Sequence, residues 1–255
     1  MKKKRSVLAL LGLALLIAGA PVFAKGKTEG QKVFVIATDT TFAPFEFQDA
    51  GGAYVGIDVD ILAAVAADQG FKYDLKPLGF SAAVAALESN QADAVIAGMS
   101  ITGERKAKYD FSTPYYDSGV VMAIRADNET ITGYENLRGQ RVAVKTGTEG
   151  AAFAESVMDA YGFEVAYFDE SPFMYDEVKS GNSAACFEDY PVMGYGISKG
   201  NGLKMVTGME KGSSYGFAVL KGKNQALLQM FNTGLQNIKK SGKYQQILNA
   251  YTAAK

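Results

Sequence analysis

Strand-like and helix-like patterns alternate along this chain, and the alternation runs twice. Short apolar runs typical of buried strands are separated by segments in which apolar residues recur every three or four positions. This order indicates an α/β fold in which helices flank a mostly parallel sheet. In the first run we predict strands over 32–38, 72–76 and 94–97 and helices over 58–68 and 81–87.

The second run begins after residues 128–130 and indicates a second α/β unit. Two long β-prone segments, 115–125 and 215–220, join the runs, so the chain leaves the first unit and later returns to it. Two helices, 224–240 and 243–251, follow the return. In the second run we predict strands over 141–145, 163–168 and 184–187 and helices over 149–161 and 173–180.

Residues 1–24 are typical of a cleaved secretory signal peptide. Four basic residues at positions 2–5 precede an apolar run from Val7 to Ala20, and small residues stand at positions 22 and 24. An apolar run of about 14 residues falls short of the roughly 18 to 20 that span a bilayer, which argues against a membrane anchor. No cysteine near the cleavage point offers a site for a lipid. We therefore expect a periplasmic protein that is not membrane-embedded after cleavage.

Composition excludes several classes of function. Loss of residues 1–24 removes 4 of the 26 basic residues and leaves 22 against 27 acidic ones, a formal charge of −5, with no Lys/Arg-rich cluster for nucleic acid. Histidine is absent, and with it the commonest general base and metal ligand. We therefore expect no hydrolase triad, no metal site and no cofactor. Cys186, the one cysteine, lies in an apolar run typical of a buried, unreactive thiol.

The turn at 56–60 carries two acidic residues and leads into an apolar helix. Ile57, Ile61 and Val65 recur at helical spacing and should face a core. Asp58 stands where a side chain can accept hydrogen bonds from the N–H groups of the first turn. We therefore interpret Asp58 as a structural acid that caps the helix, and not as a ligand-binding residue.

Four blocks of residues stand at the ends of predicted strands, where open α/β sheets bind ligands. The first block, 37–47, combines an acid with aromatic residues. The others are Gly98–Arg105, which runs on to 110–116, Lys145–Thr148 and Glu188–Pro191. In this order and at these distances the blocks resemble the polar amino-acid-binding proteins of ABC importers, bacterial solute-binding protein family 3, and most nearly its glutamine-binding members.

The resemblance extends from residue 32 to the C-terminal helices and implies a two-lobed, type II periplasmic binding protein. Each lobe would be a mostly parallel sheet flanked by helices, and two hinge strands would let the lobes close on a ligand. The implied partners are an amino acid and the permease complex of an ABC transporter, and we expect a monomer. The expected bounds are 30–114 plus 217–255 for lobe 1, 115–119 and 213–216 for the hinge, and 120–212 for lobe 2.

A free amino acid is a zwitterion, so its site needs a cation for the carboxylate and an anion for the ammonium. The resemblance implies that Arg105 grips the α-carboxylate bidentately, a geometry that lysine cannot reproduce. Backbone N–H groups near Ser100 and Thr148, the latter at the start of a predicted helix, would strengthen that grip. Asp189, the carbonyl of Gly98 and the hydroxyl of Ser100 would take the ammonium.

The side-chain end of the ligand selects the amino acid, and there the resemblance places Asp39 and Lys145. A cationic ligand would meet Lys145 and an anionic one Asp39, each a costly buried like-charge contact. A carboxamide suits both, because its oxygen accepts from Lys145 and its amino group donates to Asp39. Phe42 and Phe80 would enclose the aliphatic stem. We therefore expect glutamine first and asparagine second.

Two positions depart from the glutamine-binding pattern. Glu149 stands where that pattern has a glycine whose N–H binds the carboxylate, and Glu188 stands where it has a histidine. Either acid, by pairing with Lys145, would favour a cationic ligand, so a basic amino acid (arginine, lysine or histidine) stays open. The alternative from another class is an enzyme on the same fold, similar to cyclohexadienyl dehydratase, with Glu149 or Glu188 as general acid. A complete zwitterion site argues against that enzyme.

Overall fold

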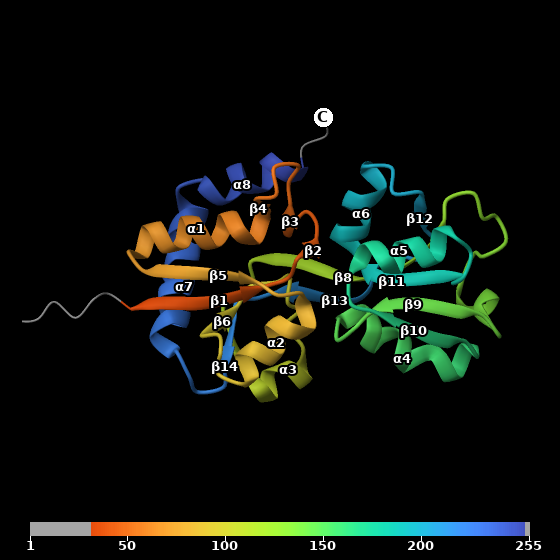
Figure 1. The fold of residues 1–255 in the computed structure, drawn as a ribbon, viewed down its shortest axis with the longest axis horizontal. Helices are drawn as coiled ribbons and strands as arrows, with labels where there is room; N and C mark the ends of the chain where they lie inside the picture. The colour runs from red at the N-terminus through yellow and green to blue at the C-terminus, as the bar shows by residue number, and fades with distance from the viewer. Residues whose placement is uncertain (1–31, 253–255) are drawn as a thin grey trace, which may run out of the picture. The chain divides into compact units, whose positions relative to one another are not determined.

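The computed structural model describes residues 32–252, and the predicted signal peptide, 1–24, lies outside them. Two large sheets carry the fold, and a small antiparallel sheet lies between β1 and α1 in the chain (Figure 1). The first large sheet has the strand order β5-β1-β6-β14-β7. Its strands are β1 (Val33–Thr38), β5 (Lys72–Pro77), β6 (Ala94–Val95), β7 (Tyr109–Phe111) and β14 (Ala218–Leu220), and those of the small sheet are β2 (Thr41–Phe42), β3 (Glu46–Gln48) and β4 (Tyr54–Val55).

The second large sheet has the order β10-β9-β11-β8-β12, and β13 also pairs with β8. Its strands are β8 (Tyr116–Arg125), β9 (Arg141–Lys145), β10 (Glu164–Phe168), β11 (Ala185–Asp189), β12 (Leu203–Met205) and β13 (Glu210–Tyr215).

Both large sheets are mixed. In the first, β1 is parallel to β5 and β6, whereas β14 is antiparallel to β6 and β7. In the second, β9 is parallel to β10 and β11, whereas β8 is antiparallel to β11, β12 and β13. The α/β class is confirmed, but the prediction of mostly parallel sheets is wrong. The exceptions are β8 and β14, the strands with which the chain enters each large sheet from the other one.

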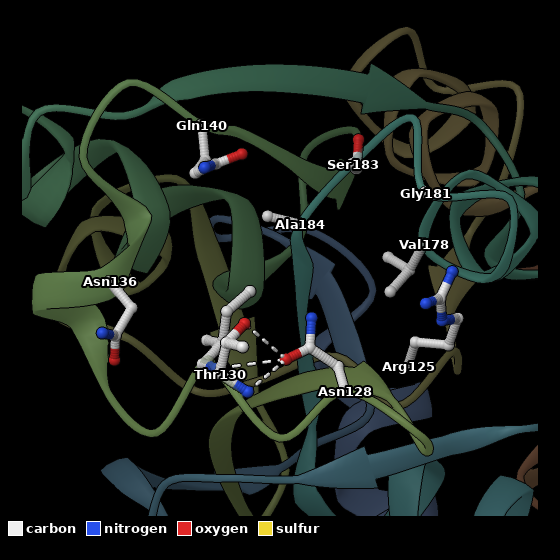
Figure 2. Close-up of a pocket in the computed structure, with 10 residues that line it drawn as sticks. Arg125, Asn128, Thr130, Asn136, Gln140, Val178, Gly181, Ser183 and Ala184 are labelled. Carbon is white, nitrogen blue, oxygen red and sulfur yellow. Dashed lines mark hydrogen bonds between the residues drawn. The ribbon is translucent and has the colours of Figure 1, made fainter.

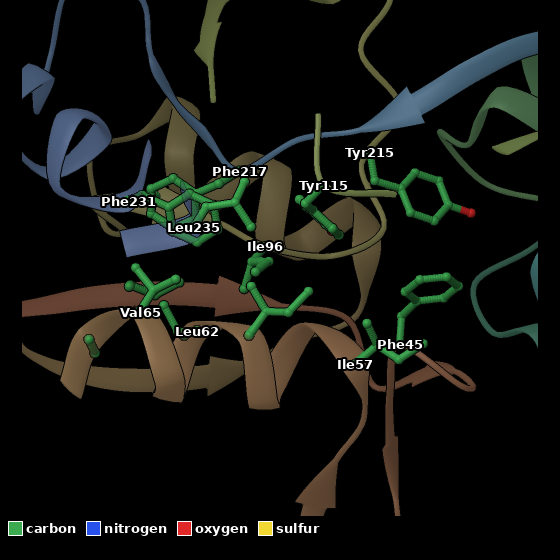
Figure 3. Close-up of a cluster of buried hydrophobic side chains, with 14 of the residues drawn as sticks. Phe45, Ile57, Leu62, Val65, Ile96, Tyr115, Tyr215, Phe217, Phe231 and Leu235 are labelled. Atoms are coloured by element: carbon green, nitrogen blue, oxygen red, sulfur yellow. The ribbon is translucent and has the colours of Figure 1, made fainter. Parts of the chain in front are cut away.

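Helices cover both faces of each large sheet. On the first sheet, α1, α7 and α8 pack on one face and α2 on the other, and the rings of Phe217 and Phe231 stack 4.2 Å apart in the core beneath α1 and α7 (Figure 3). On the second sheet, Val142 and Val144 pack towards α4 while Ala143 packs towards α5 and α6, as the two-residue period of a strand requires. The helices are α1 (Ile57–Gln69), α2 (Phe80–Glu88), α3 (Gly103–Lys108), α4 (Glu149–Tyr161), α5 (Ser171–Lys179), α6 (Tyr190–Ser198), α7 (Gln225–Lys240) and α8 (Lys243–Thr252), with a 3-10 turn at Tyr134–Leu137.

The turn before α1 explains the role of its glycine and corrects the role of its first acid. Gly56 has φ +138°, and a Cβ there would lie 2.0 Å from the carbonyl oxygen of Phe45, so only glycine fits. That oxygen accepts from the N–H of Asp58 at 3.0 Å, and the oxygen of Pro44 accepts from the N–H of Ile57 at 2.9 Å. Backbone carbonyls of the preceding turn thus satisfy the start of α1. The prediction that the Asp58 side chain caps this helix is wrong.

Two segments of the chain cross between the large sheets next to each other. Tyr116, at the start of β8, is the register partner of Tyr215 at the end of β13. The N–H of Tyr115 donates to the carbonyl of Tyr215 at 3.0 Å. The chain passes from the first sheet to the second between β7 and β8 and returns between β13, which begins at Glu210, and β14. Within residues 32–252, no helix is both long enough and apolar enough to span a membrane.

Candidate functional site

One cavity brings together most of the residues singled out in the sequence. It is small and lies at the carboxyl ends of β1, β6, β9 and β11, the ends at which open α/β sheets bind ligands. Nine of the eleven predicted ligand-binding residues line it, together with Ala97. The nine are Asp39, Phe42, Phe80, Gly98, Ser100, Arg105, Thr148, Glu149 and Asp189.

Arg105 projects from α3 and is held by backbone carbonyls. Its Nη1 donates to the oxygen of Ser100 and its Nη2 to the oxygen of Gly147, each at 3.0 Å. The guanidinium carbon lies 5.4 Å from the centre of the Phe80 ring. Burial lowers the pKa of Arg105 from its usual value, and nearby carboxylates oppose that shift. A guanidinium has five N–H donors, so these two contacts orient it and leave donors for an anion in the cavity.

Asp189 supplies a buried carboxylate at the end of β11. Its Oδ2 accepts a hydrogen bond from the hydroxyl of Tyr215 at 2.5 Å, and Tyr215 in turn accepts from Ser118 at 3.0 Å. Burial, and then the charge of Glu188, raises the pKa of Asp189 to about 7. A cation placed beside Asp189 would favour its ionised form.

The start of α4 lies against the cavity. Oγ1 of Thr148 accepts from the N–H of Ala151 at 3.3 Å, which caps a helix that begins at Glu149. The N–H groups of a first helical turn have no acceptor within the helix and attract anions. Oε1 of Glu149 lies 4.0 Å from Nζ of Lys211. Ser100, also a lining residue, is 2% exposed.

Asp39 lines the cavity and forms an ion pair with Lys145. Nζ of Lys145 donates to Oδ2 of Asp39, and both side chains are 1% exposed. Oδ1 of Asp39 accepts from the N–H of Thr40 at 2.6 Å, and Nζ of Lys145 also lies 3.4 Å from Oγ1 of Thr41. Lys145 itself does not line the cavity. The carboxylate of Asp39 therefore faces the cavity with its charge already paired.

Gly98 approaches the ring of Phe42 closely. It has φ +51°, and a Cβ would lie 2.3 Å from Cε1 of Phe42, so any side chain would displace that ring. Phe42 and Phe80 are 4% and 6% exposed and both line the cavity. The aromatic faces thus supply its apolar surface.

Glu188 is predicted as a ligand-binding residue, but its carboxylate is turned to other groups. Its Oε2 accepts from the hydroxyls of Tyr175 at 2.8 Å and Ser171 at 3.2 Å, and its Oε1 accepts from the N–H of Asp189 at 2.9 Å. Burial raises its pKa, while these hydrogen bonds lower it. Glu188 thus connects β11 to α5 and does not line the cavity.

Three residues of the site are not among those predicted from the sequence. Ala97 lines the cavity, Gly147 accepts from Arg105, and Tyr215 donates to Asp189. Ala97 takes part only by lying against the cavity, and Gly147 only through its carbonyl oxygen. Neither residue type therefore indicates a role in the site. The one signal for Tyr215 is its position at the start of the second predicted crossing.

A larger cavity lies beside the loop that follows β8 (Figure 2). Its lining residues include one cation, Arg125, and no carboxylate, so an ammonium group would find no anion there. Oδ1 of Asn128 is occupied by three donors of its own loop. This cavity therefore suits an amino acid less well than the first one.

The next two features are the possible metal ligands and the one thiol among the described residues. No group of three or more His, Cys, Asp or Glu side chains within residues 32–252 is placed to hold a metal ion. Cys186 lies on β11 with no exposed surface, and burial raises the pKa of its thiol well above the usual range. The prediction of a buried cysteine on a strand is confirmed.

Comparison with known proteins places the chain among binding proteins. Residues 34–254 match the model of a family described as bacterial extracellular solute-binding proteins, family 3. The chain is 28% identical to the L-cystine-binding protein TcyJ of Escherichia coli K12, over 98% of this chain and 96% of TcyJ. It is also 28% identical to the arginine-binding extracellular protein ArtP of Bacillus subtilis, over 92% of this chain and 95% of ArtP. Among solved structures, an ancestral arginine-binding protein bound to glutamine is 36% identical, over 86% of this chain and 97% of that one, with a TM-score of 0.80.

Proposed function

The chain belongs to family 3 of the bacterial extracellular solute-binding proteins, and we propose that its ligand is glutamine first and asparagine second. Members of this family bind solutes and are not enzymes, and this chain is an amino-acid-binding protein of an ABC importer. Its fold is that of the type II periplasmic binding proteins, as the sequence predicts. We further propose a periplasmic monomer, exported by the signal peptide 1–24, that delivers its ligand to a permease complex.

The contact between Asp39 and Lys145 carries the choice of ligand. Because the two charges pair directly and are 1% exposed, the cavity meets no uncompensated charge at Asp39. A neutral carboxamide can accept from the ammonium of Lys145 and donate to the carboxylate of Asp39. A charged side chain would have to face the group of its own sign, a contact that costs several kcal/mol when it is buried.

The remaining charges suit the main-chain groups of an amino acid. Arg105 and the start of α4 would hold the α-carboxylate, and Asp189 would hold the ammonium. Because Arg105 lies with the first sheet and Asp189 in the second, a ligand between them would hold the sheets together. We propose that the sheets belong to lobes with the bounds given above, hinged at 115–119 and 213–216.

Basic amino acids form the second candidate class, and one observation favours them. The described residues around Lys145 include more than one acid, because the charge of Lys145 acts on the buried Glu188 besides its contact with Asp39. If these acids neutralise Lys145, a cationic ligand can approach Asp39. Two of the similar proteins named above are arginine-binding proteins.

Thermal unfolding with each amino acid in turn tests the proposal. A ligand at 100 times its dissociation constant stabilises a protein by about 2.7 kcal/mol. We expect glutamine to give the largest shift in Tm and asparagine the next, with arginine, lysine, histidine, cystine and glutamate well below. Shifts with arginine or lysine and none with glutamine would favour the second candidate class and refute the carboxamide argument.

A further inference from the structure

Two acidic side chains, Glu46 on β3 and Asp58 on α1, lie together beneath the cavity with no exposed surface. Among the described residues, no N–H or O–H group donates to either carboxyl oxygen of Glu46. The backbone brings Asp58 beside Glu46, because the N–H of Asp58 donates to the carbonyl of Phe45 at 3.0 Å, and each carboxyl group shifts the pKa of the other. Two carboxyl groups can form a hydrogen bond with each other only when one of them carries a proton.

The carboxylate of Asp58 also accepts hydrogen bonds from two groups near the cavity and the first crossing. Its Oδ2 accepts from the N–H of Gly98 and from the hydroxyl of Tyr115, each at 2.7 Å. Gly98 lines the cavity, and Tyr115 begins the first crossing between the sheets. Oδ1 of Asp58 receives no N–H or O–H from residues 32–252, which leaves it as the acceptor for Glu46.

The charges that face this pair favour a single retained proton. Burial, and then the charges of Asp58 and Asp39, raises the pKa of Glu46, while Lys145 lowers it. Burial raises the pKa of Asp58 to about 6, against the hydrogen bonds from Tyr115 and Gly98. Two ionised carboxylates in contact without water would repel each other strongly.

We propose that Glu46 and Asp58 share one proton at neutral pH and act as a positioning pair that holds Gly98 in the cavity and Tyr115 at the crossing. Glu46 donates its proton to Oδ1 of Asp58, and Oδ2 keeps both of its other hydrogen bonds. The consequence for binding rests on the proposed function, in which the carbonyl of Gly98 accepts from the ammonium of the ligand. Glu46 and Asp58 do not line the cavity, so they act on the ligand through Gly98.

Infrared spectroscopy on the full chain tests the shared proton directly. At pH 7 the difference spectrum between the wild type and Glu46→Gln should contain the band of a buried, protonated carboxyl group, while the contribution of Asp189, whose pKa is about 7, cancels. The glutamine amide can donate the same hydrogen bond without titrating, so this variant should fold even where Glu46→Ala does not. A difference spectrum without that band would overturn the shared proton.

Stability gives a second readout. The pKa of Glu46 is raised in the folded state, so the unfolded chain releases this proton first as the pH rises above about 4.5. The unfolding equilibrium constant of the wild type should therefore rise with pH up to tenfold per unit more steeply than that of Glu46→Gln. Equal slopes would contradict the proposal.

Calorimetric titration with glutamine tests the positioning role. Asp58→Asn should weaken binding tenfold or more, and Glu46→Gln should bind at least tenfold more tightly than Glu46→Ala. The control is Asp60→Asn, on the same turn of α1, because Asp60 bonds to Tyr251 and lies away from the cavity. Wild-type affinity in folded Asp58→Asn would overturn the positioning role. Absence of binding by the wild type to every amino acid would contradict the proposed function instead, and the infrared band would still decide the shared proton.

Discussion

Lys145 at the end of β9 donates a hydrogen bond to Asp39 directly after β1, and both side chains are 1% exposed. The contact joins the two large sheets beside the cavity. A buried ion pair adds little net stability, because desolvation offsets the attraction, but removal of one partner leaves an uncompensated buried charge. The pair is therefore better explained by selection of the ligand than by stability of the fold.

Substitution of Lys145 should change the preferred ligand. In Lys145→Met, Asp39 stays buried without its cation, which should destabilise the unliganded protein by about 3–5 kcal/mol. A cationic ligand can then supply the missing charge, so the affinity for arginine relative to glutamine should rise at least tenfold, or about 1.4 kcal/mol. Parallel titrations with both amino acids measure the ratio.

The matched control is the double variant Asp39→Asn with Lys145→Met, which removes both charges. It should recover stability relative to Lys145→Met and lose the preference for arginine. An unchanged arginine-to-glutamine ratio in Lys145→Met would show that the pair does not select the ligand.

Asp189 should make binding depend on pH. Its pKa of about 7 in the unliganded protein means that a ligand ammonium must displace a proton at lower pH. Affinity should therefore fall by up to tenfold per pH unit below about 7. The same raised pKa means that the unfolded chain releases this proton first, so its contribution lowers stability as pH rises from about 4 to 7.

Titrations between pH 5 and 8 in wild type and Asp189→Asn measure this dependence. The variant should bind weakly at pH 8 and show a flatter profile. The same pH profile in both proteins would exclude Asp189 as the anion that meets the ammonium.

The contact between Gly98 and Phe42 should make Gly98→Ala costly. The added methyl group would lie 2.3 Å from Cε1 of Phe42 at a positive φ, so the ring must move. We expect a loss of about 1–3 kcal/mol in the free energy of unfolding, as for overpacked sites, together with weaker ligand binding. Urea denaturation and calorimetry measure the two effects.

Two glycines serve as controls for that substitution. Gly52 has φ +82° with no atom within 4 Å of an added Cβ, and Gly103 has the same free space at an ordinary φ. Gly52→Ala therefore measures only the cost of placing alanine at a positive φ. Gly103→Ala should show neither that cost nor a steric clash. If Gly98→Ala is as stable as Gly52→Ala, the contact with Phe42 contributes nothing.

The bounds of a helix or strand are predicted best where its own residues show a strong hydrophobic period. The predicted helix 149–161 coincides with α4, and the predicted ends of α1 and α7 lie within one residue of the observed ends. In contrast, α6 contains Gly194 and Gly196, both poor helix formers, and is stabilised by packing of Val192 and Met193. Strands of two residues, such as β2 and β4, are too short for any period to show.

In the site, residues whose role follows from side-chain chemistry are predictable from the sequence, whereas residues whose role depends on tertiary contacts are not. Charged and aromatic lining residues are predictable because the ligand chemistry demands those residue types in a recognisable order. The positions of Glu188 and Asp58 are not, because their partners come from distant segments: Tyr175 for the first, and Gly98 and Tyr115 for the second. No local pattern shows that a carboxylate is turned away from a cavity.

Calorimetric titration of Arg105→Ala tests most directly whether this cavity binds a polar amino acid through Arg105. The titrant is the amino acid that gives the largest thermal shift in the wild type, and Arg125→Ala, outside the cavity, is the control. We predict wild-type affinity in the control and no measurable binding in Arg105→Ala, with the circular dichroism and Tm of the unliganded variant preserved. Wild-type affinity in a folded Arg105→Ala variant would contradict the account.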